Sequence, residues 1–330
     1  MSMEIHFLNV GHGDCTIIEF PSGRIMMIDI NNTKTLPEDD VVALAENKGM
    51  STWDFRYRMA VEVRKSWEDY YKSLLVDPAD YFKANFPGKS VFRYVQTHPD
   101  LDHMSGLHRF FWQDKIGLEN FWDVAHTKEL DEDNFKNCPY DYTDWVTYLA
   151  LREGWGPKSN GSLDKEHHKV LNLLRGDTGD YWDDDGIEIL SPTAELIEVC
   201  NTTDKYNNVS YVLKITYAGR TIILPGDAES AAWNSVLDKP GANQIGCDVL
   251  KASHHGRESG YHEKAVMAMS PKAVICSVGK KPSTDASDEY ASHGATVLST
   301  RFHGTIKMTV WADGDIWIDN HKGERICTID

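Results

Sequence analysis

Cysteine pairs, long apolar runs and an excess of basic residues are all missing from this sequence. The six cysteines are scattered, and no two of them form a CxxC pair. No run approaches the roughly 18 apolar residues that a membrane-spanning helix needs. The first residues, MSMEIHFLNVGHGD, show no basic segment followed by an apolar one. We therefore expect a cytoplasmic protein with reduced thiols and no membrane contact.

Basic residues are in the minority, which limits the partners of the chain. Its 330 residues include 34 Lys and Arg against 51 Asp and Glu, a formal net charge of −17. Broad attraction to nucleic acid or to an anionic membrane needs a basic surface, so the charge argues against it. A nucleic-acid substrate held at one local site stays open, because metal ions can neutralise phosphate where Lys and Arg are scarce.

Apolar strands and helical patterns alternate over much of the chain. Three strands forming an antiparallel meander are predicted at residues 3–10, 15–20 and 24–30. From residue 187 onward strand and helix patterns alternate, which favours an α/β fold. Hydrophobic residues make up 41% of the chain, enough for a large core, and no linker divides it. We expect one domain over residues 1–330.

Two segments interrupt this pattern, a helical one at 33–89 and an irregular, acidic, Trp-rich one at 112–186. Residues 53–75 predict a helix whose apolar face packs onto the core. That face consists of Met59, Val63, Trp67, Tyr70, Tyr71 and Leu74. The second segment holds five of the ten tryptophans, and we expect its aromatic side chains to shape specificity or to bind a partner protein. Its acidic run at 183–185 predicts a solvated turn.

Four residues of metal-ligating type follow the apolar run VFRYV, in the motif HPDLDH. They are His98, Asp100, Asp102 and His103. Positions 98, 100 and 102 share one side of an extended chain, and His103 stands where the chain turns into a helix. Two such pairs facing two ions about 3.5–4 Å apart form a dinuclear hydrolase site. The alternative is a strand-to-helix turn rich in Asp and His for capping.

Two later strands also end on residues of this kind. Asp227 ends IILPGD, and His254 and His255 follow the strand in VLKASHHG. Strand ends of a layered α/β fold gather at one edge, where sites are usually built. A carboxylate there can bridge two cations. Together the three stretches favour a metal site.

The motifs HPDLDH, PGD and SHHG, in this order, resemble the metallo-β-lactamase superfamily. The stretches FLNVGHGDCTIIEFPSGRIMMIDI, NNVSYVLKITYAGRTIILPGD and HGTIKMTVWADGDIWI resemble its ComEC-type branch, the hydrolase domain of the competence DNA-uptake protein and its soluble relatives. The resemblance covers residues 3–32, 90–111 and 187–318, about half of the chain. It implies an αββα sandwich with metal ions at one edge of the two sheets. The segments 33–89 and 112–186 are then insertions.

The resemblance also implies a ligand set and a reaction. The metal ligands would be His98, Asp100, Asp102, His103, Asp227 and His254. In this scheme Asp227 bridges two ions, and His254 is favoured over His255 because it directly follows Ser253 at the strand end. We expect two divalent ions, with zinc first and manganese as the alternative. Hydrolysis by a metal-bound hydroxide would give catalytic roles to Asp102, Asp227 and His255.

Six residues are candidates for contact with the substrate: Asn207, Asn208, Ser210, Lys251, Arg257 and Asp285. The Asn-Asn-x-Ser segment stands where other branches of the superfamily supply a histidine. Lys251 and Arg257 flank the histidine pair and could hold phosphate. Asp285 stands where the branch often has a His, and a carboxylate there could not replace that His unless its pKa were raised. The alternative is that Asp285 caps a helix beginning near Ser287.

These residues favour a metal-dependent phosphodiesterase with nucleic acid as the first substrate class. A phosphodiesterase or esterase for small molecules, including cyclic nucleotides, is the alternative that the acidic charge favours. The insertions could roof the site and exclude a polymer. A third hypothesis is a degenerate hydrolase that binds a protein partner through its aromatic insertions, and the intact ligand set weighs against it.

Overall fold

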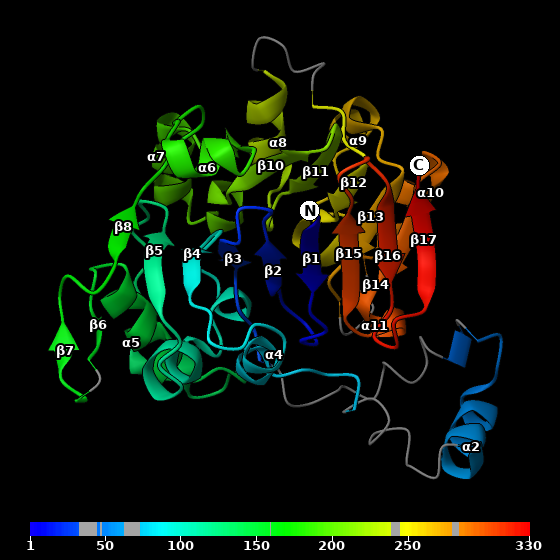
Figure 1. Cartoon of the computed structure of the whole chain (residues 1–330), viewed down its shortest axis with the longest axis horizontal. Helices are drawn as coiled ribbons and strands as arrows, with labels where there is room; N and C mark the ends of the chain where they lie inside the picture. Colours follow the sequence, from blue (N-terminus) through cyan, green and yellow to red (C-terminus); the bar gives the residue numbers. More distant parts are fainter. Residues whose placement is uncertain (33–44, 47, 63–72, 159, 239–244, 279–283) are drawn as a thin grey trace.

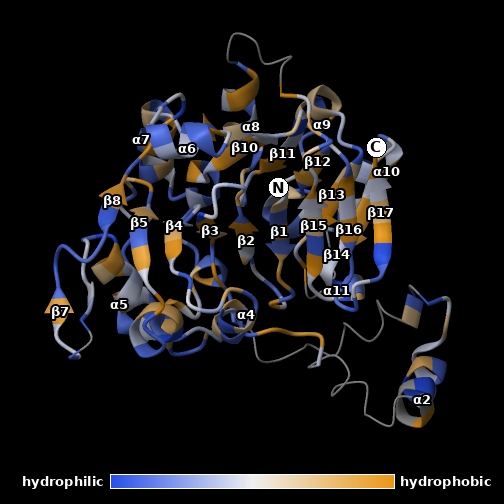
Figure 2. Cartoon of the chain, viewed as in Figure 1, coloured by the Kyte–Doolittle hydropathy of each residue, from blue (hydrophilic) through white to orange (hydrophobic). Residues whose placement is uncertain are grey.

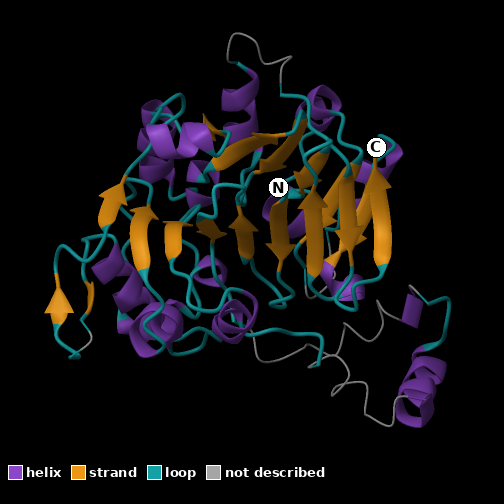
Figure 3. Cartoon of the chain, in the orientation of Figure 1, coloured by secondary structure: helices purple, strands orange, loops and turns teal. Residues whose placement is uncertain are grey.

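The computed structural model describes residues 1–32, 45–46, 48–62, 73–158, 160–238, 245–278 and 284–330. Within these ranges two large sheets lie against each other, and helices cover their outer faces (Figure 1 and Figure 3). The expectation of an αββα sandwich is confirmed. No helix in the described ranges combines the length and the apolar character needed to cross a membrane.

The first sheet has nine strands and contains the meander predicted for the N-terminus. Its order is β17 (Arg325–Ile329), β16 (Ile316–Asp319), β15 (Ile306–Val310), β1 (Met3–Phe7), β2 (Thr16–Glu19), β3 (Ile25–Ile28), β4 (Val91–Val95), β5 (Leu118–Trp122) and β8 (Lys169–Leu171). Strands β3, β4, β5 and β8 run parallel, and all other neighbours in this sheet run antiparallel.

The second sheet has six strands. Its order is β14 (Thr296–Ser299), β13 (Ala273–Cys276), β12 (Val249–Lys251), β11 (Arg220–Leu224), β10 (Val212–Tyr217) and β9 (Ile187–Ser191). Strands β11 to β14 are parallel, and β9, β10 and β11 are antiparallel. A separate hairpin pairs β6 (Gly156–Pro157) with β7 (Leu163–Asp164).

Helices close both outer faces. Those over the first sheet are α4 (Pro78–Asn85), η2 (His108–Gln113) and α5 (Tyr142–Leu151). Those packed with the second sheet are α7 (Ala194–Thr203), α8 (Ser230–Leu237), α9 (Glu263–Met269) and α10 (Ser287–Ser292). Other helical elements in the described ranges are α2 (Thr52–Glu62), α6 (Asp180–Asp184), α11 (Thr300–His303), η1 (Leu101–His103), η3 (Glu132–Phe135), η4 (Tyr206–Val209) and η6 (Ser253–Gly256).

Alternation along the strands of the first sheet produces the layers. Ile18 and Met26 belong to the core shared with the second sheet, whereas their neighbours Ile17 and Met27 pack with Phe110 and the helices outside. Successive side chains of a strand point to opposite faces of the sheet. Both faces must be apolar here, because one packs against the second sheet and the other against helices. Figure 2 shows this as hydrophobic colouring along strands of both sheets.

The first insertion contains the helix α2 (Thr52–Glu62). Its Trp53 and Tyr57 stack at 5.4 Å and are 70% and 56% exposed. The described part of the helix predicted over 53–75 extends to Glu62, and Ser73 and Leu74 form a turn where the prediction had helix. Of the expected packing face, Leu74 is buried. Val63, Trp67, Tyr70 and Tyr71 lie outside the described residues, as does the side chain of Met59.

The second insertion differs from the irregular segment that the sequence predicts. It supplies β5 and β8 to the nine-stranded sheet and contributes the helix α5. Trp122 and Trp145 are buried in the core, and Tyr148 of α5 is buried as well. Burial of two of the five tryptophans removes them as contacts for a partner. These parts of the segment are thus integral to the sandwich.

The acidic run at 183–185, which lies at the C-terminal end of α6, is only partly solvated. Asp183 and Asp184 are exposed, but Asp185 is buried. Its carboxylate lies 2.8 Å from the buried guanidinium of Arg93 and 2.8 Å from Nη2 of Arg24. The prediction of a solvated turn is therefore wrong for Asp185, which ties the insertion to β3 and β4.

Candidate metal centre

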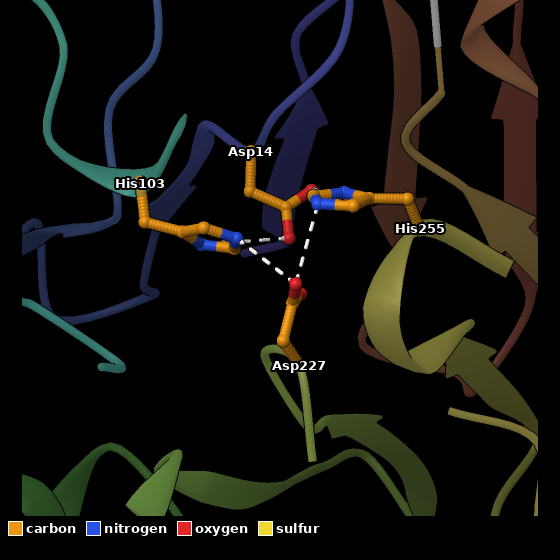
Figure 4. A group of neighbouring side chains, drawn as sticks. All are labelled: Asp14, His103, Asp227 and His255. Carbon is orange, nitrogen blue, oxygen red and sulfur yellow. Dashed lines mark ion pairs between the residues drawn. The ribbon is translucent and has the colours of Figure 1, made fainter. Parts of the chain in front are cut away.

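The three histidine and aspartate motifs meet at one edge of the two sheets. Asp102 and His103 stand on η1 after β4, Asp227 follows β11, and His255 lies on η6 after β12. The Nε2 atoms of His103 and His255 both lie 3.3 Å from Oδ2 of Asp227 (Figure 4). The Nε2 atom of His255 is also 3.3 Å from Oδ2 of Asp102. Residues from both sheets therefore converge on one carboxylate.

His98 and Asp100 form a second half of the cluster. The Nε2 atom of His98 lies 3.6 Å from Oδ2 of Asp100, and the imidazoles of His98 and His103 are 4.2 Å apart between centroids. The other oxygen of Asp100, Oδ1, accepts a hydrogen bond of 2.5 Å from Nζ of Lys128. His98 is buried, whereas the Asp100 side chain is 31% exposed. This half of the cluster therefore opens toward solvent.

Several atoms at the centre of the cluster are buried without a hydrogen-bond partner in the described part of the chain. They are Nε2 of His98, His103 and His255, and Oδ1 of Asp227. Buried polar groups in native proteins are nearly always paired, so convergent orphans call for an explanation. Imidazole nitrogens and carboxylate oxygens are the ligands of zinc and similar ions. The residues present fit divalent ions.

Asp14 belongs to the cluster although it was not among the predicted site residues. Its Oδ1 lies 3.6 Å from Nδ1 of His255, and its carboxylate pairs with the buried ammonium of Lys251. Gly13 precedes it with φ of 133°, and a Cβ there would lie 2.4 Å from the Asp102 carbonyl. The turn needs glycine for this close approach. The Gly-x-Gly-Asp turn was the signal that could have identified Asp14.

Asp29, at the end of β3, supports the cluster from behind. Its Oδ2 accepts a hydrogen bond of 2.7 Å from Nδ1 of His103, and Thr97 donates to Asp29 from its backbone N–H and its hydroxyl. A hydrogen bond at Nδ1 fixes the imidazole tautomer and leaves the Nε2 lone pair for an ion. The sequence signal was a carboxylate where an apolar strand gives way to polar residues.

His12, from the same turn as Asp14, lies on the open side of the cluster. Its Nε2 is 3.7 Å from Oδ2 of Asp102 and 3.0 Å from Nη2 of Arg257. His12, Asp102 and His255 form a second group of side chains close enough to hold an ion. Burial, helped by the charge of His255, lowers the pKa of His12 to about 4. His12 is therefore neutral at pH 7 and can accept from the guanidinium.

The histidine pair lies on unusual backbone. His254 and His255 have φ of 49° and 59°, and Gly256 has φ of 90°. Left-handed backbone at two consecutive residues with side chains is strained, and such strain concentrates at functional sites. This turn directs the buried His255 toward Asp227. His254 has its Nε2 3.7 Å from Asp227, while its Nδ1 lies 2.8 Å from Oγ of Ser259.

Charge at the centre is shared between imidazoles and carboxylates. Burial alone would raise the pKa of Asp227, but His255 and His103 outweigh it and hold that pKa well below its usual value. Burial likewise opposes the charged forms of both histidines, yet Asp227 and its fellow carboxylates raise their pKa values well above normal. Without an ion, Asp227 and the imidazoles of His103 and His255 therefore stabilise one another's charged forms.

The Asn-Asn-x-Ser segment lies beside the turn that carries Asp227. Ser210 accepts a hydrogen bond from the Asp227 N–H at 3.2 Å, and Asn208 accepts from the Ala232 N–H at 3.0 Å. The side-chain amide of Asn207 lies 3.4 Å from Oε1 of Glu229. Ser210 and Asn208 therefore hold the framework, whereas Asn207 borders an open cavity.

The other predicted substrate contacts are placed differently. Lys251 is buried beneath the cluster, where its ammonium already has Asp14 as a partner. Arg257 lies on the open side beside His12. Asp285 accepts hydrogen bonds from the backbone N–H and hydroxyl of Ser287, at 3.1 and 2.7 Å, at the start of α10. These bonds support the start of the helix, as in its alternative role, although the N-cap position itself is Ala286.

An αββα sandwich with a His and Asp cluster at its strand ends is the arrangement of the metallo-β-lactamase fold. No protein-family model matches the chain. ComE operon protein 3 of Bacillus subtilis (strain 168) is 33% identical over 106 residues, 31% of this chain and 13% of that protein. Competence protein ComA of Neisseria gonorrhoeae is 27% identical over 138 residues, 40% of this chain and 19% of that protein.

The matched segments thus span less than a fifth of either competence protein. They confirm the resemblance to ComEC-type proteins over part of the chain. Solved structures also match. The metallo-beta-lactamase fold protein YhfI from Bacillus subtilis has 9% identity, covers 90% of this chain and 96% of its own, and has a TM-score of 0.42. Igni18, a metallo hydrolase from Ignicoccus hospitalis, has 15% identity and a TM-score of 0.46. The match covers 92% of this chain and 98% of Igni18.

Proposed function

We propose that the chain is a metal-dependent phosphodiesterase. The observation that carries the proposal is a convergence of buried Nε2 atoms that have no hydrogen-bond partner among the described residues: those of His103 and His255 beside Asp227, and that of His98 beside Asp100. A cluster of this composition is costly to bury unless cations compensate it. Divalent ions bound here would lower the pKa of a coordinated water and neutralise charge on phosphate oxygens.

Two groups of side chains are close enough to hold an ion, and they share His255: Asp14, His103, Asp227 and His255, and His12, Asp102 and His255. In our proposal His98 and Asp100 add ligands on the side that opens toward solvent. The structure thus favours His255 over His254 as a ligand, because its Nε2 is close to two carboxylates of the cluster. The imidazoles suit zinc, and the carboxylates also allow manganese.

Residues behind and beside the ligands have positioning roles in this proposal. Asp29 holds His103 through Nδ1, and Asp14 faces Nδ1 of His255. Such partners fix ring orientation and raise ligand basicity. On the open side, Arg257 offers a guanidinium that can hold a phosphate oxygen.

Two substrate classes are compatible with this site. The resemblance to competence proteins supports nucleic acid. A specific observation favours a smaller phosphodiester: the cavity bordering Asp100 has a volume of about 630 Å³, within the roughly 300–1,000 Å³ of pockets that enclose small ligands. We therefore propose nucleotide-sized diesters as the second candidate.

Hydrolysis by metal-reconstituted protein tests the proposal. The substrates are bis-p-nitrophenyl phosphate, single- and double-stranded DNA, RNA and cyclic nucleotides, each with zinc and with manganese. Elemental analysis of the same preparation gives the metal content. Asp227→Asn should lose metal and activity together, whereas the exposed Asp184→Asn should keep both. Full metal content and full hydrolysis in Asp227→Asn would refute the proposal.

A further inference from the structure

A lysine of the second insertion reaches the candidate metal centre. Lys128 donates from Nζ to Oδ1 of Asp100 at 2.5 Å, while Oδ2 of the same carboxylate faces His98 at 3.6 Å. The Lys128 side chain is 21% exposed and borders the cavity. Asp100 therefore has one oxygen directed to the ligand cluster and the other to an ammonium on its open side.

The loop that carries Lys128 is fixed by a buried network. The Lys128 N–H donates to Nδ1 of His126 at 3.0 Å, and Nε2 of His126 lies 2.5 Å from the Tyr148 hydroxyl. Tyr148 in turn donates to Asp123 at 2.6 Å, and Arg152 pairs with that carboxylate at 3.0 Å. The helix α5 thus holds the backbone of Lys128 through a continuous chain of hydrogen bonds.

A second set of contacts ties the same loop to α7. Asn201 accepts a hydrogen bond from the Thr127 N–H at 3.0 Å and donates to the Ala125 carbonyl at 3.2 Å. The Lys128 ammonium also lies 5.6 Å from the centre of the Tyr206 ring. A long, flexible lysine is thereby presented from a backbone anchored on both sides, which reduces the entropy lost when it contacts a ligand.

The cavity beside Lys128 has a charge that selects among phosphate ligands. Its lysines are Lys128 and Lys205, and its carboxylates are Asp100, Glu129, Asp204 and Glu229. The carboxylates of the cavity repel a ligand with many phosphates, because most of its phosphates would lie beside a negative charge. A ligand with one phosphate can place it beside Asp100, where the ammonium of Lys128 attracts it. The volume of about 630 Å³ suits a ligand of one or two nucleotides.

Resting on the proposed function, we propose that Lys128 binds the phosphate of the substrate. The insertion thereby selects phosphodiesters of one or two nucleotides that fit the cavity. Lys128 exchanges part of its contact with Asp100 for a phosphate oxygen when the ligand enters. An ammonium–phosphate contact is charge-assisted and therefore among the stronger hydrogen bonds.

Titration calorimetry with thymidine 5′-monophosphate on zinc-loaded protein tests this role. Lys128→Met should raise the Kd about tenfold or more, and Lys128→Gln should do the same. Lys128→Arg, which keeps the charge, should restore most of the affinity. Lys136→Met is the matched control. Lys136 lies in the same insertion, but its side chain is exposed and its Nζ lies 2.7 Å from Oδ1 of Asp133. Its Kd should equal that of the wild type.

Metal content, measured on every variant, separates this role from a structural one. The neutral variants should retain the zinc of the wild type. Loss of zinc together with nucleotide affinity would overturn the proposal, because Lys128 would then only support Asp100. Equal affinity in wild type and Lys128→Met, or no binding by the wild type, would also overturn it. Failure of the proposed function appears separately, as wild-type protein that binds no metal or does not hydrolyse bis-p-nitrophenyl phosphate.

Competition tests the size of the ligand. The dinucleotide thymidylyl-thymidine should displace thymidine 5′-monophosphate from the wild-type protein. Double-stranded DNA at the same phosphate concentration should displace much less, because it meets the acidic wall of the cavity. Equal displacement by both would overturn selection for short diesters.

Discussion

His103 donates a hydrogen bond from Nδ1 to Oδ2 of Asp29 across 2.7 Å, and its Nε2 faces Asp227 at 3.3 Å. One imidazole therefore links a carboxylate behind the site to the carboxylate at its centre. Asp29 is itself fixed by two hydrogen bonds from Thr97. This arrangement specifies which nitrogen is available to an ion.

The first prediction concerns that link. Asp29→Asn should weaken zinc binding about 10- to 100-fold, because an amide accepts more weakly and can present its NH₂ to His103. Competition with a chelator of known affinity measures the change. Asp144→Asn is the control: Asp144 is another buried carboxylate, and it accepts from the Gly106 and His108 N–H groups. Equal zinc affinity in Asp29→Asn and wild type would contradict the role assigned to Asp29.

The second prediction separates the two neighbouring histidines. His255→Gln should lose zinc, because its Nε2 lies 3.3 Å from both Asp102 and Asp227. His254→Gln should retain zinc, because its Nε2 lies farther from Asp227, at 3.7 Å, and outside both groups of side chains close enough to hold an ion. Elemental analysis after dialysis against metal-free buffer gives the stoichiometry of each. The opposite result, with zinc lost only from His254→Gln, would restore the assignment favoured by the sequence.

Local patterns in the sequence were sufficient for the framework of this fold. The apolar strands at the N-terminus and after residue 187 form as predicted, and each motif lies directly after its strand. The sequence did not predict Asp14 and Asp29 as site residues, because their roles depend on contacts with His255 and His103, which lie far away in the sequence. The pattern of apolar and polar residues around Asp14 and Asp29 indicates local secondary structure and does not indicate such long-range contacts.

The strands and the helix of the second insertion were not predicted, for a different reason. In β5 the buried Leu118, Phe121 and Trp122 are interrupted by exposed and half-buried polar residues, so the strand carries no clean alternation. Its pairing with β4 and β8 is parallel, and a parallel register depends on residues far away in the sequence. The position of Lys128 follows from that pairing and could not be predicted from composition.

The third prediction concerns the buried pair that ties the insertion to the sheet. Asp185→Ala should lower the free energy of unfolding by about 3–5 kcal/mol, since it leaves the guanidinium of Arg93 buried without its partner. Asp184→Ala is the control, because its side chain is 70% exposed and lies 3.9 Å from Arg24. Urea denaturation of both variants measures the difference. Equal stability in the two would mean that Arg93 finds another partner.

The last prediction concerns pH and the loop that carries Lys128. Burial, aided by the charges of Arg152 and Lys128, lowers the pKa of His126 from 6.5 to about 3. Its Nδ1 accepts from the Lys128 N–H, so protonation at Nδ1 would break that bond. The unfolded chain binds the proton first as pH falls, and the stability that neutral His126 contributes is present above pH 6.5 and lost progressively toward pH 3.

At pH 5 this loss amounts to about 2 kcal/mol relative to neutral pH. His126→Asn removes the titrating group but can still accept from the Lys128 N–H through its side-chain oxygen. Urea denaturation between pH 7.5 and pH 5 should therefore show a smaller decline in the variant than in the wild type. Parallel declines in the two proteins would mean that His126 is protonated in the folded state, and the hydrogen bond that positions Lys128 would then be absent in acid.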